Sequence, residues 1–433
     1  MSLKNNWQTK KLGEICEEII TGDWGKGEKY QNLIPCKVIR GTDFPSVQKG
    51  DFSSVPIRYV SSKKIKELKL NKGDILLEIS GGSKDQPTGR ILFWDKDTQF
   101  PVIFSNFVRK LKLNTKEIEP KYFFRYWQFL YLKGKTKDYE ERTTNIRNFK
   151  FKYFLENEEI PLPPLSVQEK IVKILDAIQE AVDIQEKIIE KTKELKKSMM
   201  ANLFKYGGPS FRKGRKLKKT EIGEIPEDWE VVMLREALKS LESGDRPKGG
   251  KLVHNPLGVL SIGAENINWD GCLELKDCLR FDKNFYCSLK KGKIEENDIL
   301  LVKDGATIGK LAYIEKIPEG MAMVNEHVFL LKTEITKFNP KFLFYFLSSK
   351  VGQQQIKTSI SGSAQGGINK SILDNILIFA PPLSEQQEIA EILQTIDQKI
   401  EIEKRKKELY EELFKTMLNK IMNQEIDIEK VEI

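Results

Sequence analysis

A stretch that occurs twice limits what this chain can fold into more than any other feature. PPLSVQEKIVKILDAI begins at Pro163 and PPLSEQQEIAEILQTI begins at Pro381, a shift of 218 residues (381 − 163). The shift holds without a gap to the end of the helical pattern, whereas small repeat proteins have periods of only about 20–50 residues. The chain is therefore predicted to be a duplicated module, in which one globular part and one long helix each occur twice.

Each copy of the stretch carries the signals of a helix start. Its double proline holds the preceding chain extended and does not continue a helix. Ser166 and Glu169 have the spacing of a capping box. Ser384 and Gln387 repeat that spacing in the second copy. A helix is therefore predicted to begin at the same place in both copies.

Apolar residues follow each start at alternating spacings of three and four, which is typical of a coiled-coil seam. Gly207 and Gly208 are predicted to end the first helix. A helix of about 40 residues is near 60 Å long, too long for one small core to cover, so the other copy is the expected partner. The predicted seam contains Ile171, Leu175, Ile178, Val182, Ile189, Leu195 and Met199, and Ile389, Leu393, Ile396, Ile400, Tyr410, Leu413 and Met417.

Composition limits the classes of protein that fit. The 433 residues predict two to four domains, and a hydrophobic content of 39% is enough for folded cores. No apolar run approaches the roughly 20 residues of a membrane span and no signal-peptide core is present, so a cytoplasmic protein is expected. Buried or idle thiols are favoured over a zinc site at Cys272, Cys278 and Cys287, since no CxxC pair occurs. The net charge of +9 favours an anionic partner.

The globular parts that precede the two helices have the same order of segments. The Trp7 segment matches the one at Trp229, GDILL matches NDILL, and PKYFF at Pro120 matches PKFLF at Pro340. Small loop insertions explain why the shift changes along the chain. The predicted domains are a first globular part over 1–158, a spacer helix over 159–208, a second globular part over 209–376 and a second spacer helix over 377–433.

The sequence contains no catalytic motif that predicts an enzyme. It has no G-x-G-x-x-G after a strand, no Walker A motif and no NPPY or DPPY tetrapeptide. ELK triplets at Glu67, Glu194 and Glu274 match a metal nuclease's carboxylate-x-Lys pair only as expected by chance in a chain rich in Lys and Glu. Asp74 and Asp298, at matched positions, are interpreted as turn residues that open a strand. No catalytic residue, no metal and no cofactor of its own are therefore predicted.

The loops combine glycine with side chains suited to nucleic acid. Arg pairs with guanine edges, Asn and Gln pair with adenine, and Lys holds phosphate. The alternative, ordinary solvated loops, stays open for any single residue. The candidate DNA-binding residues are Lys26, Lys84, Gln86, Arg90, Arg142, Thr143, Thr144, Asn145, Arg147, Arg246, Lys248, Lys303, Lys310, Gln353, Gln354, Lys357, Gln365, Asn369 and Lys370.

Two basic segments allow two interpretations each. The linker 211–220 either meets phosphate or is solvated. KRKK at 404–407 is interpreted as a solvated helix face, with contact to DNA or a partner subunit as the alternative.

This order of segments resembles the specificity (S) subunits of type I restriction–modification enzymes over nearly the whole chain. The resemblance is carried by IPLPPLSVQEK and IFAPPLSEQQE, by the paired TGD and SGD loops, and by the paired GDILL and NDILL strands. It implies an α+β fold with two duplicated α/β target-recognition domains and two long helices. The helices would form an antiparallel coiled coil, with pseudo-twofold symmetry between the halves.

The resemblance also implies a function and partners. Each recognition domain would bind one half of a bipartite, asymmetric site in double-stranded DNA, and helix length would set the spacing of the half-sites. The partners would be two methyltransferase (M) subunits and restriction (R) subunits, with S-adenosylmethionine, ATP and Mg²⁺ bound by those partners. Three alternatives remain: a specificity subunit of a related fused restriction–methylation enzyme, a single-chain nuclease, and a coiled-coil scaffold without affinity for nucleic acid.

Overall fold

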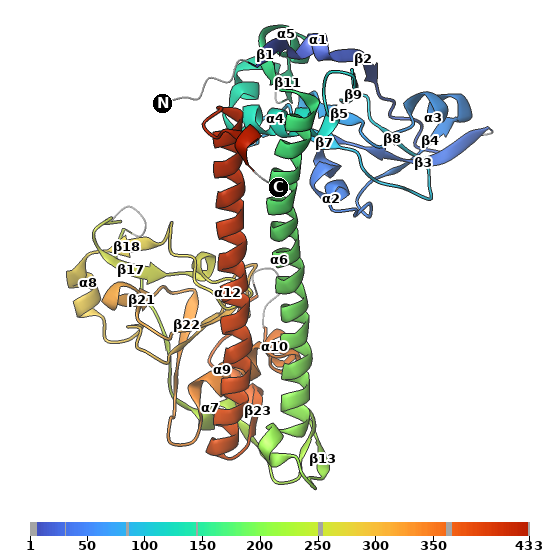
Figure 1. Cartoon of the computed structure of the whole chain (residues 1–433). Coiled ribbons are helices and arrows are strands. Elements are labelled where there is room, and N and C mark those ends of the chain that lie inside the picture. The colour runs from blue at the N-terminus through green and yellow to red at the C-terminus, as the bar shows by residue number, and fades with distance from the viewer. Residues whose placement is uncertain are drawn as a thin grey trace. The chain divides into compact units, whose positions relative to one another are not determined.

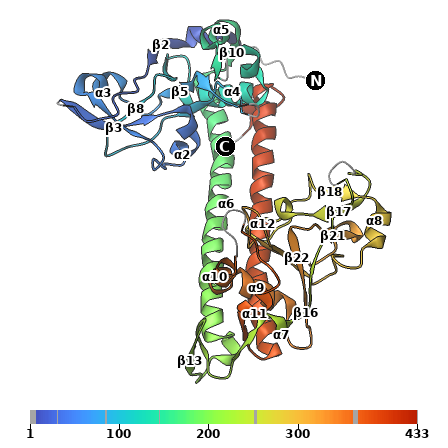
Figure 2. The ribbon, with the colours of Figure 1, turned by 180° about the vertical axis from the view of Figure 1, so that it is seen from behind.

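The computed structural model describes residues 7–30, 32–83, 86–143, 146–249, 254–360 and 366–431. The chain forms two compact units, of which unit 1 contains residues 1–185 and 406–433, and unit 2 contains residues 186–405 (Figures 1 and 2). Each unit therefore combines one globular part with portions of both long helices, whereas the predicted domains follow the chain one after another.

The described residues of unit 1 form four sheets. Their strand orders are β2-β9-β5-β7, β4-β3-β8, β10-β11-β6 and β1-β12. Helix α4 covers the largest sheet with a face of buried aromatic side chains, because its apolar residues recur at helical spacing. The elements are β1 (Gln8–Lys11), α1 (Leu12–Ile15), β2 (Cys16–Thr21), β3 (Leu33–Ile39), α2 (Phe44–Gln48), β4 (Ile57–Ser61), α3 (Ser62–Leu68), β5 (Ile75–Glu78), β6 (Ser80–Gly81), β7 (Ile91–Phe93), β8 (Val102–Phe104), β9 (Val108–Leu113), α4 (Pro120–Leu132), β10 (Glu140–Thr143), β11 (Ile146–Phe149), α5 (Phe151–Asn157) and β12 (Glu159–Leu162).

Unit 2 repeats the sheets of unit 1 except for β10-β11-β6, which has no counterpart among its described residues. Its sheets have the orders β16-β22-β19-β20, β18-β17-β21 and β15-β23, with an added hairpin β13-β14. The elements are β13 (Leu217–Thr220), β14 (Gly223–Pro226), β15 (Glu230–Met233), α7 (Leu234–Ala237), β16 (Leu238–Ser243), β17 (Val259–Ile262), β18 (Leu279–Phe281), α8 (Lys283–Ser288), β19 (Ile299–Val302), β20 (Leu311–Tyr313), β21 (Ala322–Val324), β22 (Val328–Thr333), α9 (Pro340–Ser348), α10 (Lys350–Thr358), α11 (Ile372–Asn375) and β23 (Leu377–Ala380).

The duplication extends to strand register. In unit 1, β3 pairs parallel with β8 so that Ile39 lies opposite Phe104. In unit 2, β17 pairs parallel with β21 so that Ile262 lies opposite Val324. Since these strands occupy the same places in the two parts, the structure confirms the prediction of a duplicated α/β module.

Two long helices, α6 (Leu165–Tyr206, 42 residues) and α12 (Leu383–Met422, 40 residues), run antiparallel to each other. In unit 1, the beginning of α6 packs with the end of α12, where Leu175 and Leu418 share one core. In unit 2, the end of α6 packs with the beginning of α12, where Lys196 forms an ion pair of 2.5 Å with Asp397. Both views show the helices side by side within each unit (Figures 1 and 2). The antiparallel pairing that was predicted is thus confirmed.

The predicted seam is wrong at two matched positions. Leu195 is 53% exposed and Leu413 is 43% exposed. The seven-residue repeat of the stripe leads from Ile189 to Lys196 and from Ile400, after two repeats, to Phe414. Leu195 and Leu413 each lie one residue earlier, and one residue turns a helix by about 100°. The other predicted positions are buried or half-buried: Ile171, Leu175, Ile178, Val182, Ile189, Met199, Ile389, Leu393, Ile396, Ile400, Tyr410 and Met417.

The repeated PPLS-x-Q segment fastens each helix to its globular part through the glutamine. The side chain of Gln168 accepts a hydrogen bond from the Glu119 amide at 2.9 Å and donates to the carbonyls of Glu117 (3.1 Å) and Pro163 (2.9 Å). Gln386 repeats the pattern in unit 2, with the Asn339 amide at 2.8 Å. The glutamine thus fixes where α4 or α9 begins relative to the long helix.

The predicted capping boxes are wrong, although the helix starts are near the predicted places. Helix α6 begins at Leu165 and α12 begins at Leu383, so Ser166 and Ser384 lie inside the first turn. The carbonyl of Pro164 accepts the first helical hydrogen bond, from the Gln168 amide at 3.0 Å. A proline therefore occupies the N-cap position that the serine was expected to fill.

A turn aspartate opens each of the matched strands β5 and β19, as predicted; Asp74 is half-buried and Asp298 is buried. Asp74 accepts a hydrogen bond from the Asn71 amide, and Asp298 accepts one from the Glu295 amide. Lys332 lies 3.2 Å from the Asp298 carboxylate, yet burial raises the pKa of Asp298 to about 6. This buried carboxylate is thus a pH-sensitive point in the core of unit 2.

The basic segments hold unit 2 together. In the linker, Arg215 donates to Glu385 at 2.8 Å and to Asp228 at 2.5 Å, and hydrogen bonding to Glu385 raises the pKa of Arg215. In KRKK, Lys404 pairs with Asp270 at 2.8 Å. Arg215 and Lys404 therefore bind carboxylates of their own unit, which neither interpretation of the two segments had included.

Candidate nucleic-acid interface

In each unit, three connections between strands meet at one end of the strands of the four-stranded sheet. In unit 1 they are residues 22–26, 79–81 and 105–107, and we call them the first junction. In unit 2 the matched residues are 244–248, 303–305 and 325–327, and we call them the second junction. They follow β2, β5 and β8 in the first case and β16, β19 and β21 in the second.

Matched backbone hydrogen bonds join the connections of the two junctions in the same way. The Ile79 amide donates to the carbonyl of Phe107 at 3.0 Å. At the equivalent place the Lys303 amide donates to the carbonyl of His327, also at 3.0 Å. A fourth segment joins each junction, because Phe149 donates to the Ile79 carbonyl and Ile368 donates to the Lys303 carbonyl.

The paired TGD and SGD loops owe their glycine to this packing. A Cβ atom on Gly22 would overlap the carbonyl oxygens of Phe104 and Ser105. A Cβ on Gly244 would overlap the carbonyl oxygen of Val324. The close approach requires glycine, so this motif of the resemblance serves to bring two connections together.

The described candidate residues of unit 1 lie on or beside the first junction, but some have structural partners. Lys26 and Gln86 are exposed. Arg90 forms an ion pair of 2.6 Å with Glu78, which raises the pKa of Arg90, and Arg147 pairs with Glu140 at 3.1 Å. Lys84, Thr144, Asn145 and the side chains of Arg142 and Thr143 lie outside what the structure describes.

The candidate residues of unit 2 follow the same division. Arg246, Lys248 and Lys303 belong to the second junction, where the Lys303 ammonium lies 5.1 Å from the centre of the Phe329 ring. Gln353 on α10 donates to the Gly309 carbonyl at 2.9 Å, so its amide has a structural role. Lys310 is half-buried beside the second junction, Gln354, Lys357, Asn369 and Lys370 are exposed, and Gln365 lies outside the described residues.

Sequence reasoning included Arg246 among the candidates but missed Trp24, Phe107 and His327, which also distinguish the two junctions. The first junction presents Phe107, which is 54% exposed, and Trp24, whose ring lies 4.7 Å from the guanidinium of Arg58. The second junction has His327 and Arg246 at the equivalent positions. Aligning the two halves of the chain residue by residue would have paired these positions and shown the contrast.

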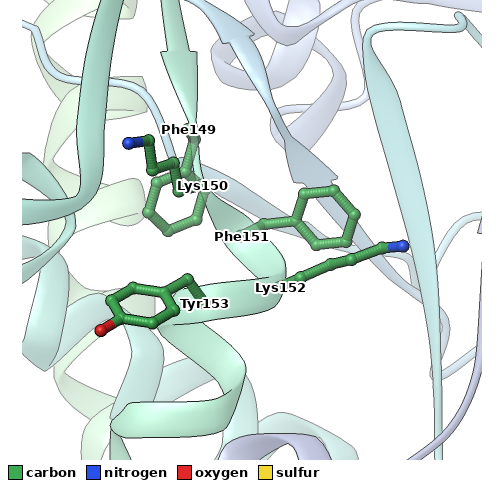
Figure 3. Close-up of a pocket in the computed structure, with 5 residues that line it drawn as sticks. All are labelled: Phe149, Lys150, Phe151, Lys152 and Tyr153. Carbon is green, nitrogen blue, oxygen red and sulfur yellow. The ribbon is translucent and has the colours of Figure 1, made fainter.

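A shallow hollow of about 480 Å³ lies beside the first junction, at the end of β11 and the start of α5 (Figure 3). It is lined by residues 149–153, and Figure 3 shows the Lys150 and Lys152 amines pointing to opposite sides. Arg109 donates to the Asn106 carbonyl at 2.7 Å and lies 5.7 Å from the Phe151 ring, so the hollow adjoins the junction. Such a surface of rings and cations suits contact with bases and phosphates.

The described residues offer binding chemistry. Within them, no three His, Cys, Asp or Glu side chains gather as a metal site requires. Cys36 and Cys278 are buried free thiols, and burial raises the pKa of each to about 11. No helix in the same part of the chain is long and apolar enough to cross a membrane. What the junctions do present is exposed cations, amides and aromatic rings.

Comparison with known proteins agrees with this organisation. The family described as "Type I restriction modification DNA specificity domain" matches residues 4–194 and 226–412. The type I restriction enzyme MjaVIII specificity subunit of Methanocaldococcus jannaschii is 32% identical over 84% of this chain and 82% of that relative. A second specificity-subunit relative from the same organism is 27% identical over 98% of this chain and 95% of its own length.

Solved structures share the fold. The S subunit of a type I restriction–modification system from M. genitalium superposes with a TM-score of 0.58 at 16% identity, covering 97% of this chain and 98% of that one. A chain from a study of complex assembly and conformational transition of the type I R-M system gives a TM-score of 0.55 at 16% identity, covering 98% and 99%. These similarities extend over both units and both long helices.

Proposed function

This chain belongs to the family of type I restriction–modification DNA specificity proteins, and from that premise we propose that it is the sequence-reading subunit of such a complex. Each unit would bind one half of a bipartite, asymmetric DNA site. The chain itself would position DNA for partner enzymes and carry no catalysis.

The observation that carries this proposal is the pair of junctions with matched backbone hydrogen bonds and two sets of side chains. The Ile79–Phe107 and Lys303–His327 hydrogen bonds join the same two connections in both junctions. Phe107 and Trp24 in one, and His327 and Arg246 in the other, give them different chemistry. Two different readers on one scaffold are what an asymmetric site in two parts requires.

The partners follow from the same proposal. Two methyltransferase subunits with S-adenosylmethionine, and restriction subunits driven by ATP and Mg²⁺, would supply the chemistry that this chain lacks. The antiparallel helices α6 and α12 would set the spacing of the half-sites and carry the methyltransferase subunits. Because the substrate is cellular DNA, the complex would act in the cytoplasm.

Exchanging one recognition part for that of a relative tests the proposal. Residues 1–158 are replaced by the equivalent segment of another specificity subunit, and the assembled complex is offered DNA. Mapping of methylated adenines is expected to show one new half-site and one unchanged half-site. If both half-sites change, or if the wild-type complex binds DNA without the steep loss of affinity that salt causes at phosphate contacts, the proposal is wrong.

A further inference from the structure

A chain of charged side chains links the three connections of the second junction. The Arg246 guanidinium lies 2.7 Å from Glu326, and Glu326 lies 3.4 Å from Nε2 of His327. Nδ1 of His327 lies 2.6 Å from the carboxylate of Asp304. The series thus begins at an arginine of the first connection, passes through Glu326 and His327 of the third, and ends at a carboxylate of the second.

The backbone fixes the position of the carboxylate end. The Lys303 amide and carbonyl are both hydrogen-bonded, to His327 and Ile368, immediately before Asp304. Asp304 itself forms a β-bridge with Gly367. Gly305 follows with a φ of +83°, and a Cβ there would meet no atom within 4 Å, so the chain turns away into open space. The Asp304 side chain remains 37% exposed at this turn.

The first junction has the matched backbone hydrogen bonds but lacks this series of charged side chains. Ser80 stands where Asp304 stands, and Phe107 stands where His327 stands. Asp23, the acidic residue of its first connection, accepts a hydrogen bond from the Gly25 amide at 2.7 Å and so belongs to a turn. Because the backbone hydrogen bonds of the first junction form without these charged side chains, the charged side chains of the second junction are not needed for folding.

An exposed carboxylate on a DNA-binding surface weakens binding through phosphate repulsion unless it accepts a hydrogen bond from a base. In the major groove the available donors are the exocyclic amino groups of cytosine and adenine. Arg246 offsets the charge of Glu326, and the hydrogen bond from His327 holds Asp304 in one orientation. These properties suit a selective acceptor.

We propose, on the basis of the proposed function, that Asp304 reads the exocyclic amino group of one base in the half-site bound by unit 2. His327, Glu326 and Arg246 are positioning residues that hold the Asp304 carboxylate toward the groove. Unit 1 reads its half-site without a carboxylate at this place.

The test selects DNA from a randomised library with the full chain assembled with its methyltransferase subunits. The wild type is expected to select two half-sites, one of which contains a required cytosine or adenine. Asp304→Asn replaces a pure acceptor by an amide with one acceptor and two donors. Discrimination at that one base pair is expected to fall about ten- to hundred-fold, while the other half-site stays unchanged.

Matched variants separate reading from charge and from folding. Asp277→Asn removes the same charge from an exposed position of unit 2 outside the junction, and it should leave the selected sequence unchanged. His327→Ala should lose discrimination at the same base pair as Asp304→Asn, whereas His327→Gln, which keeps a donor for Asp304, should retain most of it. Each variant should unfold at the wild-type temperature.

Base analogues identify the group that is read. Replacing the required base by an analogue without its amino group should weaken wild-type binding and leave Asp304→Asn binding nearly unchanged. If Asp304→Asn selects the wild-type sequence with wild-type discrimination, the assignment of Asp304 is wrong while the proposed function stands. If the wild type selects no bipartite sequence, both are wrong.

Discussion

Replacement of Gln168 by methionine should release the start of α4 from the long helix. Methionine has a similar volume but neither accepts nor donates the hydrogen bonds that the buried amide makes, so packing is largely kept. The change leaves the Glu119 amide without its acceptor and removes the donor shared by the carbonyls of Glu117 and Pro163. A buried group that loses its partner costs about 1–3 kcal/mol, and we expect about 3 kcal/mol for the set.

Amide hydrogen exchange measures this effect where it occurs. A local loss of about 3 kcal/mol corresponds to roughly 100-fold faster exchange of the Glu119 amide and its neighbours in α4. Gln386→Met should have the same effect around Asn339 in unit 2 and leave α4 unchanged.

Gln179→Met is the matched control, because Gln179 lies on the same helix and its side chain donates a hydrogen bond to the neighbouring, exposed Asp183 at 3.0 Å. If Gln168→Met and Gln179→Met exchange alike at Glu119, the glutamine does not fasten the helix, and the assigned role of the repeated segment is refuted.

Three further predictions concern stability and spacing. Because the pKa of Asp298 is raised to about 6, the folded state binds its proton more tightly than the unfolded chain, whose aspartate has its ordinary pKa of 3.8. The stability of unit 2 should therefore fall by about 3 kcal/mol as pH rises from 4 to above 6, and Asp298→Asn should remove this slope in urea titrations; an equal slope in the variant would contradict the assignment. Leu175→Asp should cost about 3 kcal/mol or more of unfolding free energy, while Leu195→Asp should change it by about 0.5 kcal/mol or less, and similar losses would show that both face the seam. Deleting the matched segments 185–191 and 403–409 shortens each helix by about 10 Å, so methylation mapping should find half-sites about three base pairs closer. An unchanged spacing in an intact complex would contradict the proposal that helix length sets the spacing of the half-sites.

The candidate site was only partly predictable. Lys26, Arg246 and Lys303 lie between strands, as the loop prediction required. The prediction was wrong for other candidates, because Arg142, Thr143 and Arg147 lie in β10 and β11, and Gln353, Gln354 and Lys357 lie on α10. Arg90, Arg147 and Gln353 also have structural partners, because Glu78, Glu140 and the Gly309 carbonyl meet them only after the sheet has formed. The sequence of a segment does not reveal which distant residues its side chains will contact across the sheet.

The repeat and its periodicity determined the duplication and the two long helices, whereas their antiparallel pairing was an expectation from the family resemblance that the structure confirmed. A repeat of 218 residues and a three–four spacing are properties of the chain that survive any detail of packing. The same reasoning erred by one position at Leu195 and Leu413, because a helix turns by about 100° at each residue and only the partner helix shows which position faces it.

Only the tertiary structure decided which loops meet. Asp304, Glu326 and Arg246 lie far apart in the sequence, and strand register in the sheet brings them within hydrogen-bond reach of one another through His327. Local patterns specify helices and strands because those depend on neighbouring residues. The chemistry of a junction depends on pairings between distant strands, which the folded sheet alone establishes.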